Sequence, residues 1–423
     1  MHGADKPPDA DNGLYGRRAF LRGGIAAGAG GAVLLNAAAH GSELPRRETW
    51  MQAPGGPMTA SGGPSAFEAH VRRQPIASQP GTDGSGASRT PLQHLDGIIT
   101  PSRLHFERHH SGIPDIDPAR HKLYVHGLVK RPLAFDVESL SHYPMVSRVQ
   151  FLECSGNSGV LIAPQAQDMD CAAIHGLLSV SEWGGVPLAV LLDEAGLAPT
   201  SKWIVADGAD AAVMSRSVPL EKILDDAIVA LYQNGERLRP GNGYPMRLFL
   251  PGWEGNASVK WLRSIKVTDR PAMSKDETSK YSDLRADGAA ELFTFPMGVK
   301  SVITSPSPGL GMGPPGLYQI SGLAWSGAGR IRGVEVSVDG GRTWAEAQLD
   351  AHVLPKCATR FRAAWQWNGA PATIMSRAVD ESGAQQPTRE VVMRNRSPGS
   401  FYHVNPIQAW RIDADGEARN VYV

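Results

Sequence analysis

The pattern of apolar and polar positions changes character along the chain. Between about residues 96 and 295, short apolar runs alternate with segments of helical spacing, which is typical of strands mixed with short helices. The runs that we expect to be strands are 123–125, the run that leads to Cys154, 203–206, 228–232 and 247–250. We expect a short helix at 137–140 and another that opens with Trp183-Gly184-Gly185-Val186-Pro187 and closes at Gly196. The sequence therefore predicts an α+β domain over residues 96–295.

From about residue 296 the period of the pattern shortens to two. Apolar positions alternate with exposed neighbours in three runs, which contain Val334, Val336 and Val338, then Trp365 and Trp367, then Ile374, Ser376 and Ala378. A turn at Asp339-Gly340-Gly341 follows the first run. Short strands with turn signals and without a convincing helix predict an immunoglobulin-like β-sandwich over residues 296–423.

The first 39 residues have the pattern of an export signal. Arg17-Arg18 precedes an uncharged stretch, Gly23 to Ala39, that ends in the small residues Ala37-Ala38-Ala39. This order predicts a cleaved signal of the twin-arginine class, which exports folded proteins, so we expect the mature protein in the periplasm. An ordinary signal or a membrane anchor that happens to carry two arginines is the alternative.

The mature part of the chain begins with a segment of biased composition. Residues 40–95 are rich in Pro, Gly, Ser, Ala and Gln, with little hydrophobic periodicity, and we interpret them as a linker or a loosely held arm. No later stretch has the roughly 18 uncharged apolar residues that a membrane span needs. We therefore expect no membrane span in the mature chain.

Charge and short motifs exclude several classes of function. The chain has 42 Lys and Arg and 42 Asp and Glu, and removal of residues 1–39 leaves a net charge near −1. A nucleic-acid partner would require a strongly basic surface, so none is expected. The sequence contains no Cys-x-x-Cys-His, so we expect no haem in this chain, and no Gly-x-Gly-x-x-Gly that would indicate a nicotinamide site.

Cys154 is the residue with the clearest candidate chemistry. It lies in Phe151-Leu152-Glu153-Cys154-Ser155-Gly156-Asn157-Ser158-Gly159, which predicts a buried strand followed by a glycine-rich turn where the backbone can approach a bulky group. A thiolate there is a soft metal ligand or a nucleophile, and a buried structural thiol is the alternative. The other cysteines are Cys171 and Cys357, so a Cys154–Cys171 disulfide is a rival to the ligand role.

Several segments, in a common order and at similar spacing, carry a family resemblance. They are Phe106-Glu107-Arg108-His109-His110, Glu153-Cys154-Ser155-Gly156-Asn157, Asn242-Gly243-Tyr244-Pro245-Met246-Arg247, the stretch 251–262, and in the second half 322–327 and 338–344. In these segments the chain resembles the sulfite oxidase family of molybdenum enzymes, whose motifs include Phe-x-Arg-Asn-His and Gln-Cys-Ala-Gly-Asn. The resemblance extends from about residue 96 to the C-terminus.

The resemblance implies a sulfite-oxidase-type molybdopterin domain followed by an immunoglobulin-like β-sandwich dimerisation domain. It implies that Cys154 binds molybdenum and that Arg108 contacts an anionic substrate. Further contacts with the molybdopterin cofactor are implied for Phe106, Arg108, His109, His110, Asn242, Arg247, Ser258, Val259 and Lys260. Guanidinium and ammonium groups suit the cofactor's phosphate and an oxyanion substrate, and glycines 252 and 255 allow backbone amides to approach the cofactor.

The chain also departs from the family pattern. His109 replaces the Asn of Phe-x-Arg-Asn-His, and Asn242 replaces the His of a His-Gly-x-Pro stretch. The segments 276–283 and 299–304 resemble a narrower group, the molybdenum subunit of the Sox sulfane dehydrogenase, often labelled sulfite dehydrogenase. In this group Tyr281 falls where the family places an active-site tyrosine, which can hydrogen-bond oxygen at the reaction centre.

The implied activity is oxygen-atom transfer from water to sulfur. The narrower resemblance implies that the substrate is a sulfane sulfur on a carrier-protein cysteine, and a c-type cytochrome subunit would accept the electrons because this chain has no haem motif. A homodimer through the C-terminal domain is also implied. The alternatives are a sulfite dehydrogenase that acts on free sulfite and, more remotely, a cofactor-free binding protein with an immunoglobulin-like domain and Cys154 in a disulfide.

Overall fold

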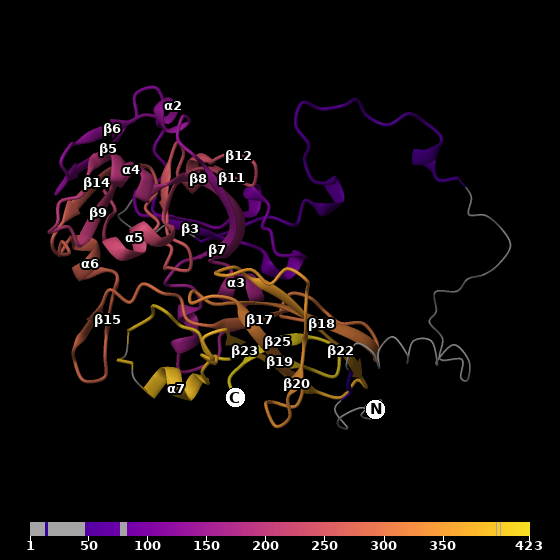
Figure 1. Cartoon of the computed structure of the whole chain (residues 1–423). Helices are drawn as coiled ribbons and strands as arrows, with labels where there is room; N and C mark the ends of the chain where they lie inside the picture. Colours follow the sequence, from indigo (N-terminus) through magenta and orange to yellow (C-terminus); the bar gives the residue numbers. More distant parts are fainter. Residues whose placement is uncertain (1–12, 16–46, 77–82, 395, 398) are drawn as a thin grey trace, which may run out of the picture.

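The computed structural model describes residues 13–15, 47–76, 83–394, 396–397 and 399–423. Arg17, Arg18 and the apolar stretch of the expected signal lie outside these residues. Figure 1 shows two folded parts, one containing the sheets around β5 (Leu123–Gly127) and β8 (Leu178–Pro187), the other containing those around β18 (Gly316–Trp325) and β23 (Ala372–Asp380). The first part carries most of the described helices and the second is nearly all strand, as the change of sequence period indicates.

Two sheets form the frame of the first domain. One has the strand order β10 (Ser215–Pro219), β9 (Trp203–Gly208), β14 (Leu262–Thr268), β5 and β6 (Leu133–Phe135), with β14 and β5 parallel. The other has the order β12 (Glu236–Arg237), β11 (Ile228–Gln233), β8 and β7 (Val146–Glu153), with β13 (Arg247–Phe249) paired to β11. Buried aliphatic side chains from both sheets form a core with the helices α4 (Leu188–Ala195) and α5 (Leu220–Asp226). This burial of apolar area is the main stabilising term of the domain.

The helix expected to open at Trp183 begins at Leu188 instead. Residues Trp183 to Pro187 continue β8 and pair with β11, where Val186 faces Val229 in the register. A Cβ atom at Gly185 would lie 2.1 Å from the carbonyl oxygen of Val229, so the glycine there permits close strand approach rather than a helix start. Gly196 ends the helix at φ 70°, as predicted. The expected helix at 137–140 is α2 (Val137–Leu140), with Asp136 in a capping box.

The segment interpreted as a linker or loosely held arm contributes to the first domain. Within residues 40–95, β2 (Gln74–Ile76) and β3 (Gly86–Arg89) form a sheet with β4 (Glu107–His109). The 3₁₀ turn at Leu92–His94 packs against α3 (Cys171–His175), and Leu92 is buried. The earlier described part, 47–70, has short 3₁₀ turns at Thr49–Met51 and Ala66–Glu68 and is largely exposed. The sequence pattern did not predict structure in this segment because its second half is held by strand pairing and lacks a regular hydrophobic pattern.

The second domain is a sandwich of two sheets. One sheet has the order β1 (Leu14–Tyr15), β22 (Thr359–Trp367), β18 and β17 (Lys300–Ser305), with β21 (Gln348–Leu349) also on β22. The other has the order β20 (Ala345–Glu346), β19 (Ile331–Ser337), β23, β24 (Ala409–Ile412) and β25 (Ala418–Val421). One helix was not expected here, α7 (Arg389–Arg394), which has no buried residue. Such a surface helix lacks the apolar stripe by which a sequence pattern reveals a helix.

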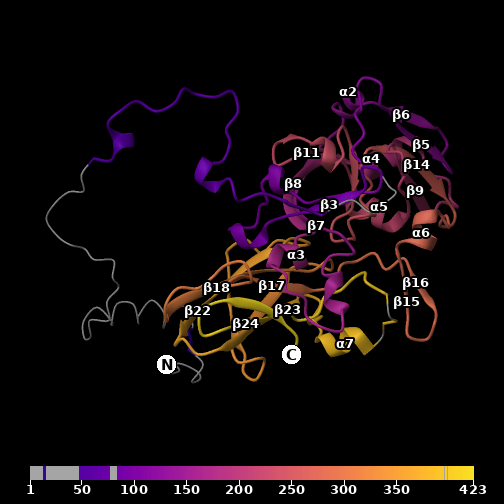
Figure 2. The same cartoon turned by 180° about the vertical axis from the view of Figure 1, so that it is seen from behind.

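The junction between the domains is apolar and continuous. A single core cluster joins Trp325, Trp365 and Trp410 of the sandwich to Phe151 and Leu161 of the first domain. Figure 2 shows β7 and α3 lying directly against the sheet of β17 and β18. The hairpin of β15 (Ser282–Leu284) and β16 (Ala290–Leu292) and the helix α6 (Lys275–Ser279) connect the two domains. Residues from both domains can therefore contribute to one site.

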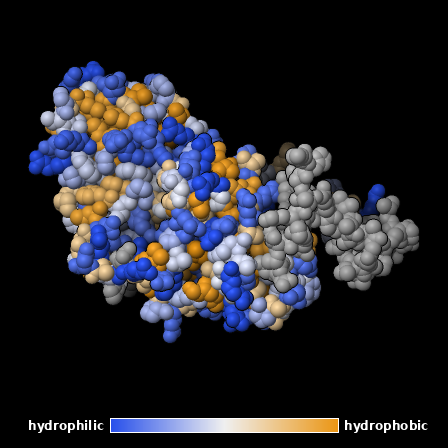
Figure 3. Space-filling model, turned by 60° about the horizontal axis from the view of Figure 1, so that its bottom comes forward, coloured by the Kyte–Doolittle hydropathy of each residue, from blue (hydrophilic) through white to orange (hydrophobic). Residues whose placement is uncertain are grey.

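Three further observations bear on the sequence-based expectations. Cys154, Cys171 and Cys357 are free thiols, so the rival Cys154–Cys171 disulfide is not formed. Within the described ranges, no helix is long and apolar enough to cross a membrane. On the face turned forward in Figure 3, apolar residues are interspersed with polar ones.

Candidate active site

One cavity of the first domain gathers the residues predicted to hold the cofactor and substrate. Gly252, expected to allow approach to the cofactor, lies instead against Gly327 of the second domain, where a Cβ atom would be 2.5 Å from the Gly327 carbonyl oxygen. The cavity contains about 670 Å³ of space not filled by protein atoms, part of it open to solvent. The predicted residues that line it are Phe106, Arg108, His109, His110, Cys154, Asn242, Arg247, Ser258, Val259, Lys260 and Tyr281. They come from segments up to 175 positions apart (106 to 281), which the sheets bring together.

Cys154 follows directly after β7, at the wall of this cavity. Its amide donates to the carbonyl of Leu177 at 3.0 Å, and its carbonyl accepts from the amide of Asn157 at 2.9 Å, which closes a tight turn. The amide of Gly255 donates to the carbonyl of Glu153 at 2.7 Å, and a Cβ atom at residue 255 would lie 2.9 Å from that oxygen. Burial raises the pKa of the Cys154 thiol. A metal at this sulfur would provide the positive charge that favours the thiolate.

Two cations, the buried Arg247 and the half-buried Lys260, line the cavity without a carboxylate to pair with them. Arg247 donates to the backbone carbonyls of Asn242 at 3.0 Å and Ser258 at 2.7 Å, and its Nε has no hydrogen-bond partner. Burial lowers the pKa of Arg247 to about 9. Burial, followed by the charge of Arg247, lowers the pKa of Lys260 well below its ordinary value. In the described chain, neither cation has a carboxylate within ion-pair distance. Such a pair favours a bound anion, because a phosphate would supply the missing negative charge.

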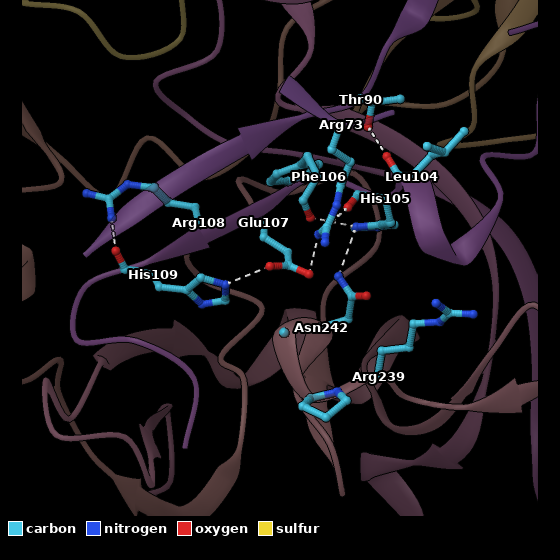
Figure 4. A network of polar contacts seen from close by, with 12 residues as sticks. Arg73, Thr90, Leu104, His105, Phe106, Glu107, Arg108, His109, Arg239 and Asn242 are labelled. Carbon is cyan, nitrogen blue, oxygen red and sulfur yellow. Dashed lines mark hydrogen bonds and ion pairs between the residues drawn. The ribbon is translucent and has the colours of Figure 1, made fainter. Parts of the chain in front are cut away.

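Glu107, which the sequence reasoning did not assign to the site, organises one wall of the cavity. Figure 4 shows its carboxylate between Arg73 and His109. Burial would raise its pKa, but hydrogen bonds from His109 and Arg73 and the charge of Arg73 outweigh this and lower it to about 2. His109 in turn lies 2.7 Å from the ammonium nitrogen of Lys260. This chain of contacts fixes His109 and Lys260. The sequence could have indicated Glu107, because it lies between the predicted site residues Phe106 and Arg108. It gave no indication of Arg73, which lies in the segment predicted to be a linker.

Tyr281 and His110 also line the cavity, with Cys154. The Tyr281 hydroxyl lies 2.8 Å from His110 Nε2. Burial, followed by the charges of Arg108 and Lys280, lowers the pKa of His110 to about 3. Burial, followed by the charge of Cys154, raises the pKa of Tyr281 well above its ordinary value. Both side chains are therefore neutral near pH 7, and the pair can exchange hydrogen-bond roles without a change of charge.

A buried ionic cluster supports Tyr281 from behind. The guanidinium carbon of Arg216 lies 4.8 Å from the centre of the Tyr281 ring. Arg216 donates to Glu277 at 2.9 Å and to Glu254 at 2.9 Å, and its side chain is fully buried. Glu254 also accepts from Asn256 at 2.8 Å, a residue of the cavity wall. Sequence reasoning missed this cluster because Arg216, Glu254 and Glu277 lie in separate segments and come together only in the fold.

A second buried ion pair lies beneath Cys154 and joins the two domains. The Glu153 carboxylate accepts from Lys300 Nζ at 3.1 Å, from Trp325 Nε1 at 2.6 Å and from Asn157 Nδ2 at 2.9 Å. Lys300 also donates to Ser158 Oγ at 2.6 Å. Glu153 and Lys300 expose 1% and 2% of their side chains. Since Lys300 and Trp325 belong to the sandwich, the second domain fixes the backbone that carries the cysteine.

The residues present fit the molybdopterin cofactor that the resemblance implies. A thiol stands at the cavity wall, where it can supply one sulfur ligand. Besides Arg247 Nε, the buried polar atoms Asn256 Oδ1 and His105 Nε2, on two further wall residues, have no protein partner. Unpaired buried donors and acceptors around a cavity are the pattern that a polar ring system and a phosphate would satisfy.

Two family models match the chain. Residues 110–275 match the oxidoreductase molybdopterin binding domain, and residues 292–408 match the Mo-co oxidoreductase dimerisation domain. The α+β class and the two-domain fold are thereby confirmed.

Curated relatives extend this result. The chain is 30% identical over 314 residues to sulfite oxidase of Gallus gallus, covering 69% of this chain and 68% of that protein. It is 29% identical to mitochondrial sulfite oxidase of Homo sapiens, covering 71% and 59%, and 32% identical to nitrate reductase [NADH] of Solanum lycopersicum, covering 66% and 34%. The chain thus spans only part of the mammalian and plant relatives.

A solved structure matches over a greater share of the chain. This is the sulfane dehydrogenase SoxCD from Paracoccus pantotrophus, with a TM-score of 0.88 and 43% identity. The match covers 90% of this chain and 100% of the other.

Proposed function

This chain belongs to the sulfite oxidase family of molybdopterin enzymes, and we propose that it is the molybdenum subunit of a sulfane dehydrogenase. Its substrate would be a sulfane sulfur held on a cysteine of a carrier protein, with water as the source of oxygen. The observation that carries the proposal is that Cys154, the cations Arg247 and Lys260, and the His110–Tyr281 pair line one cavity. The 43% identity to a sulfane dehydrogenase over that whole chain supports the narrower choice of substrate.

When bound, the molybdenum cofactor supplies oxygen-atom transfer and takes up two electrons for each oxygen delivered. Cys154 would hold the metal through its sulfur, and Arg247 and Lys260 would neutralise the cofactor's phosphate. Arg108 lines the same cavity and its charge acts on Cys154, so it can hold the negative end of a substrate near the cysteine. Tyr281 can donate a hydrogen bond to the oxygen that is transferred, with His110 as its fixed partner.

We propose that the electrons leave one at a time to a c-type cytochrome subunit, that two copies of this chain associate through residues 296–423, and that the protein works in the periplasm. The match of residues 292–408 to a dimerisation domain supports the second point. The Arg17-Arg18 leader supports the third.

Molybdenum content and a comparison of two substrates test the proposal. The purified protein should hold one molybdenum per chain, and it should reduce cytochrome c with a persulfidated carrier protein at a much higher kcat/KM than with free sulfite. If the purified chain carries no molybdenum, the proposal that it is a molybdenum enzyme is rejected, and a cofactor-free binding protein becomes the preferred function.

Oxidation of free sulfite is the second candidate, and the likeness to sulfite oxidases favours it. A preference for free sulfite over the persulfidated carrier, in a protein that carries molybdenum, would establish this alternative. The two substrates should be compared at equal concentrations of the same cytochrome, so that electron acceptance does not decide the result.

A further inference from the structure

A strand of two residues from the expected leader completes the edge of the second domain. In β1, Leu14 pairs with Trp365 and Tyr15 pairs with Ala364, antiparallel to β22. The amide of Gln366 donates to the carbonyl of Gly13 at 2.8 Å. This contact joins residues about 350 positions apart, and it lies two residues before Arg17-Arg18 in the sequence.

The local fit of this segment has the character of a built site. Leu14 exposes 5% of its surface and belongs to the main core cluster of the sandwich. Gly13 has φ 80°, and a Cβ atom there would lie 2.4 Å from the carbonyl oxygen of Gln366. A glycine is therefore required for the close approach, followed at once by an apolar residue that fills a core position.

The rest of the β22 edge shows why the segment matters. Along its whole length β22 pairs with β18 on one side, and on the other side β21 covers Phe361 and Arg362. Beyond Arg362 on the same side, β1 pairs with Ala364 and Trp365 within the described chain. Without residues 13–15 the outer edge at 364–366 would have free backbone groups, and such an edge accepts an added strand.

The order of synthesis determines when the contact between β1 and β22 can form. Residues 13–15 are made before β22, which belongs to the second domain, so the strand can dock only after β22 has been made and the sandwich has folded. We propose that Gly13–Tyr15 is a removable edge strand, which ties the leader of the precursor to the completed second domain and which is lost when the leader is cleaved. The occupant of this edge in the precursor is thus the chain's own leader, and the mature protein has an open β22 edge. The proposal rests on the expectation that residues 1–39 are removed, and it is independent of the substrate.

Hydrogen exchange at single-residue resolution tests the docking. The full-length precursor is compared with a chain that begins at residue 40, both loaded with cofactor. The Gln366 amide should exchange about ten- to a hundredfold more slowly in the precursor, the range expected for burial of one leucine. Because amides alternate in direction along a strand, those of Trp365 and Trp367 point toward β18 and serve as internal controls that should not change. Equal exchange of Gln366 in both proteins would overturn the proposal.

A matched pair of precursor variants removes the dependence on truncation. Leu14→Asp places a charge in the core position and should raise Gln366 exchange to the level of the truncated chain. Leu21→Asp makes the same change elsewhere in the leader and should leave Gln366 slow. If Leu14→Asp leaves Gln366 protected, the strand is not the source of the protection.

Limited proteolysis supplies a readout on the leader itself. Trypsin cleavage after Arg17 and Arg18 should be several-fold faster in the Leu14→Asp precursor than in the wild type or in the Leu21→Asp control. Identical cleavage rates in the three precursors would show that the folded domain does not restrain the leader.

Discussion

The buried Glu153–Lys300 pair gives the sharpest test of how the second domain supports the cysteine. In Lys300→Met, Glu153 loses a donor at 3.1 Å and Ser158 loses one at 2.6 Å, while the carboxylate stays buried at 1% exposure. Two lost charge-assisted hydrogen bonds at about 1.5–3 kcal/mol each give a sum of about 3–6 kcal/mol. This agrees with the roughly 3–5 kcal/mol expected when one partner of a buried ion pair is removed.

The reverse change and the double change complete the cycle. Glu153→Gln alone leaves the ammonium of Lys300 buried without a counter-charge, so it should destabilise by a similar amount. Glu153→Gln with Lys300→Met removes both charges, and the glutamine oxygen can still accept from Trp325 or Asn157. The double variant should therefore lie within about 1.5 kcal/mol of the wild type, because replacing a buried pair by neutral groups is often neutral. The coupling energy between the two sites should be at least about 2 kcal/mol.

Urea unfolding followed by tryptophan fluorescence measures these free energies, with molybdenum content as a second readout. Lys356→Met is the matched control, since Lys356 pairs with Asp226 at a partly exposed site and should cost less than about 1 kcal/mol. A cost below about 1 kcal/mol for Lys300→Met, or a double variant no more stable than either single one, would refute the assignment of this pair as a structural link between the domains.

Three further predictions concern the cavity and its supports. Cys154→Ser should abolish oxidation of the sulfur substrate with an artificial acceptor while the fold is kept, because a serine oxygen is a harder ligand than a thiolate, whereas Cys171→Ala should be mild. Arg108→Met should raise KM about ten- to a hundredfold at normal molybdenum content, through the loss of about 1.5–3 kcal/mol of charge-assisted binding; an unchanged KM would reject its role. Burial would raise the pKa of Glu254, but the charge of Arg216 and a hydrogen bond from His403 outweigh this and lower it to about 2. Its contribution to stability is therefore complete above about pH 4.5 and is lost as the pH falls to about 2, so Glu254→Gln should flatten the acid limb of the unfolding free energy by a few kcal/mol.

The elements with regular apolar patterns could be predicted from the sequence. The strands expected at 203–206 and 228–232 are β9 and β11, and the helix expected at 137–140 is α2 with the same bounds. The start of α4 was misplaced because glycine and proline at 184–187 are typical of a helix start in isolation. In the fold they permit close approach of β8 to β11 instead.

The residues that line the cavity could be named because they lie in segments that resemble a family, while the pairing of their supports could not be predicted. Glu277 and Lys300 lie in segments of resemblance and Arg216 does not, but each acquires its partner from a distant segment. Pairing of buried charges across 61 or 147 positions depends on the final packing of the sheets, which a local pattern does not contain.

The turn after Cys154 shows how far local reasoning reaches and where it stops. Its glycines indicate that the backbone there approaches a bulky group. The bulky group in the fold is an aromatic side chain of the chain itself: a Cβ atom at Gly156 would lie 3.3 Å from the Phe401 ring, and one at Gly159 would lie 3.1 Å from the Phe401 carbonyl oxygen. The second domain thus holds the cysteine segment from two sides, with Lys300 beneath it and Phe401 against its turn. Because both contacts act on the strand end that carries the proposed metal ligand, a change in domain packing should alter metal binding before it alters the first domain's own core.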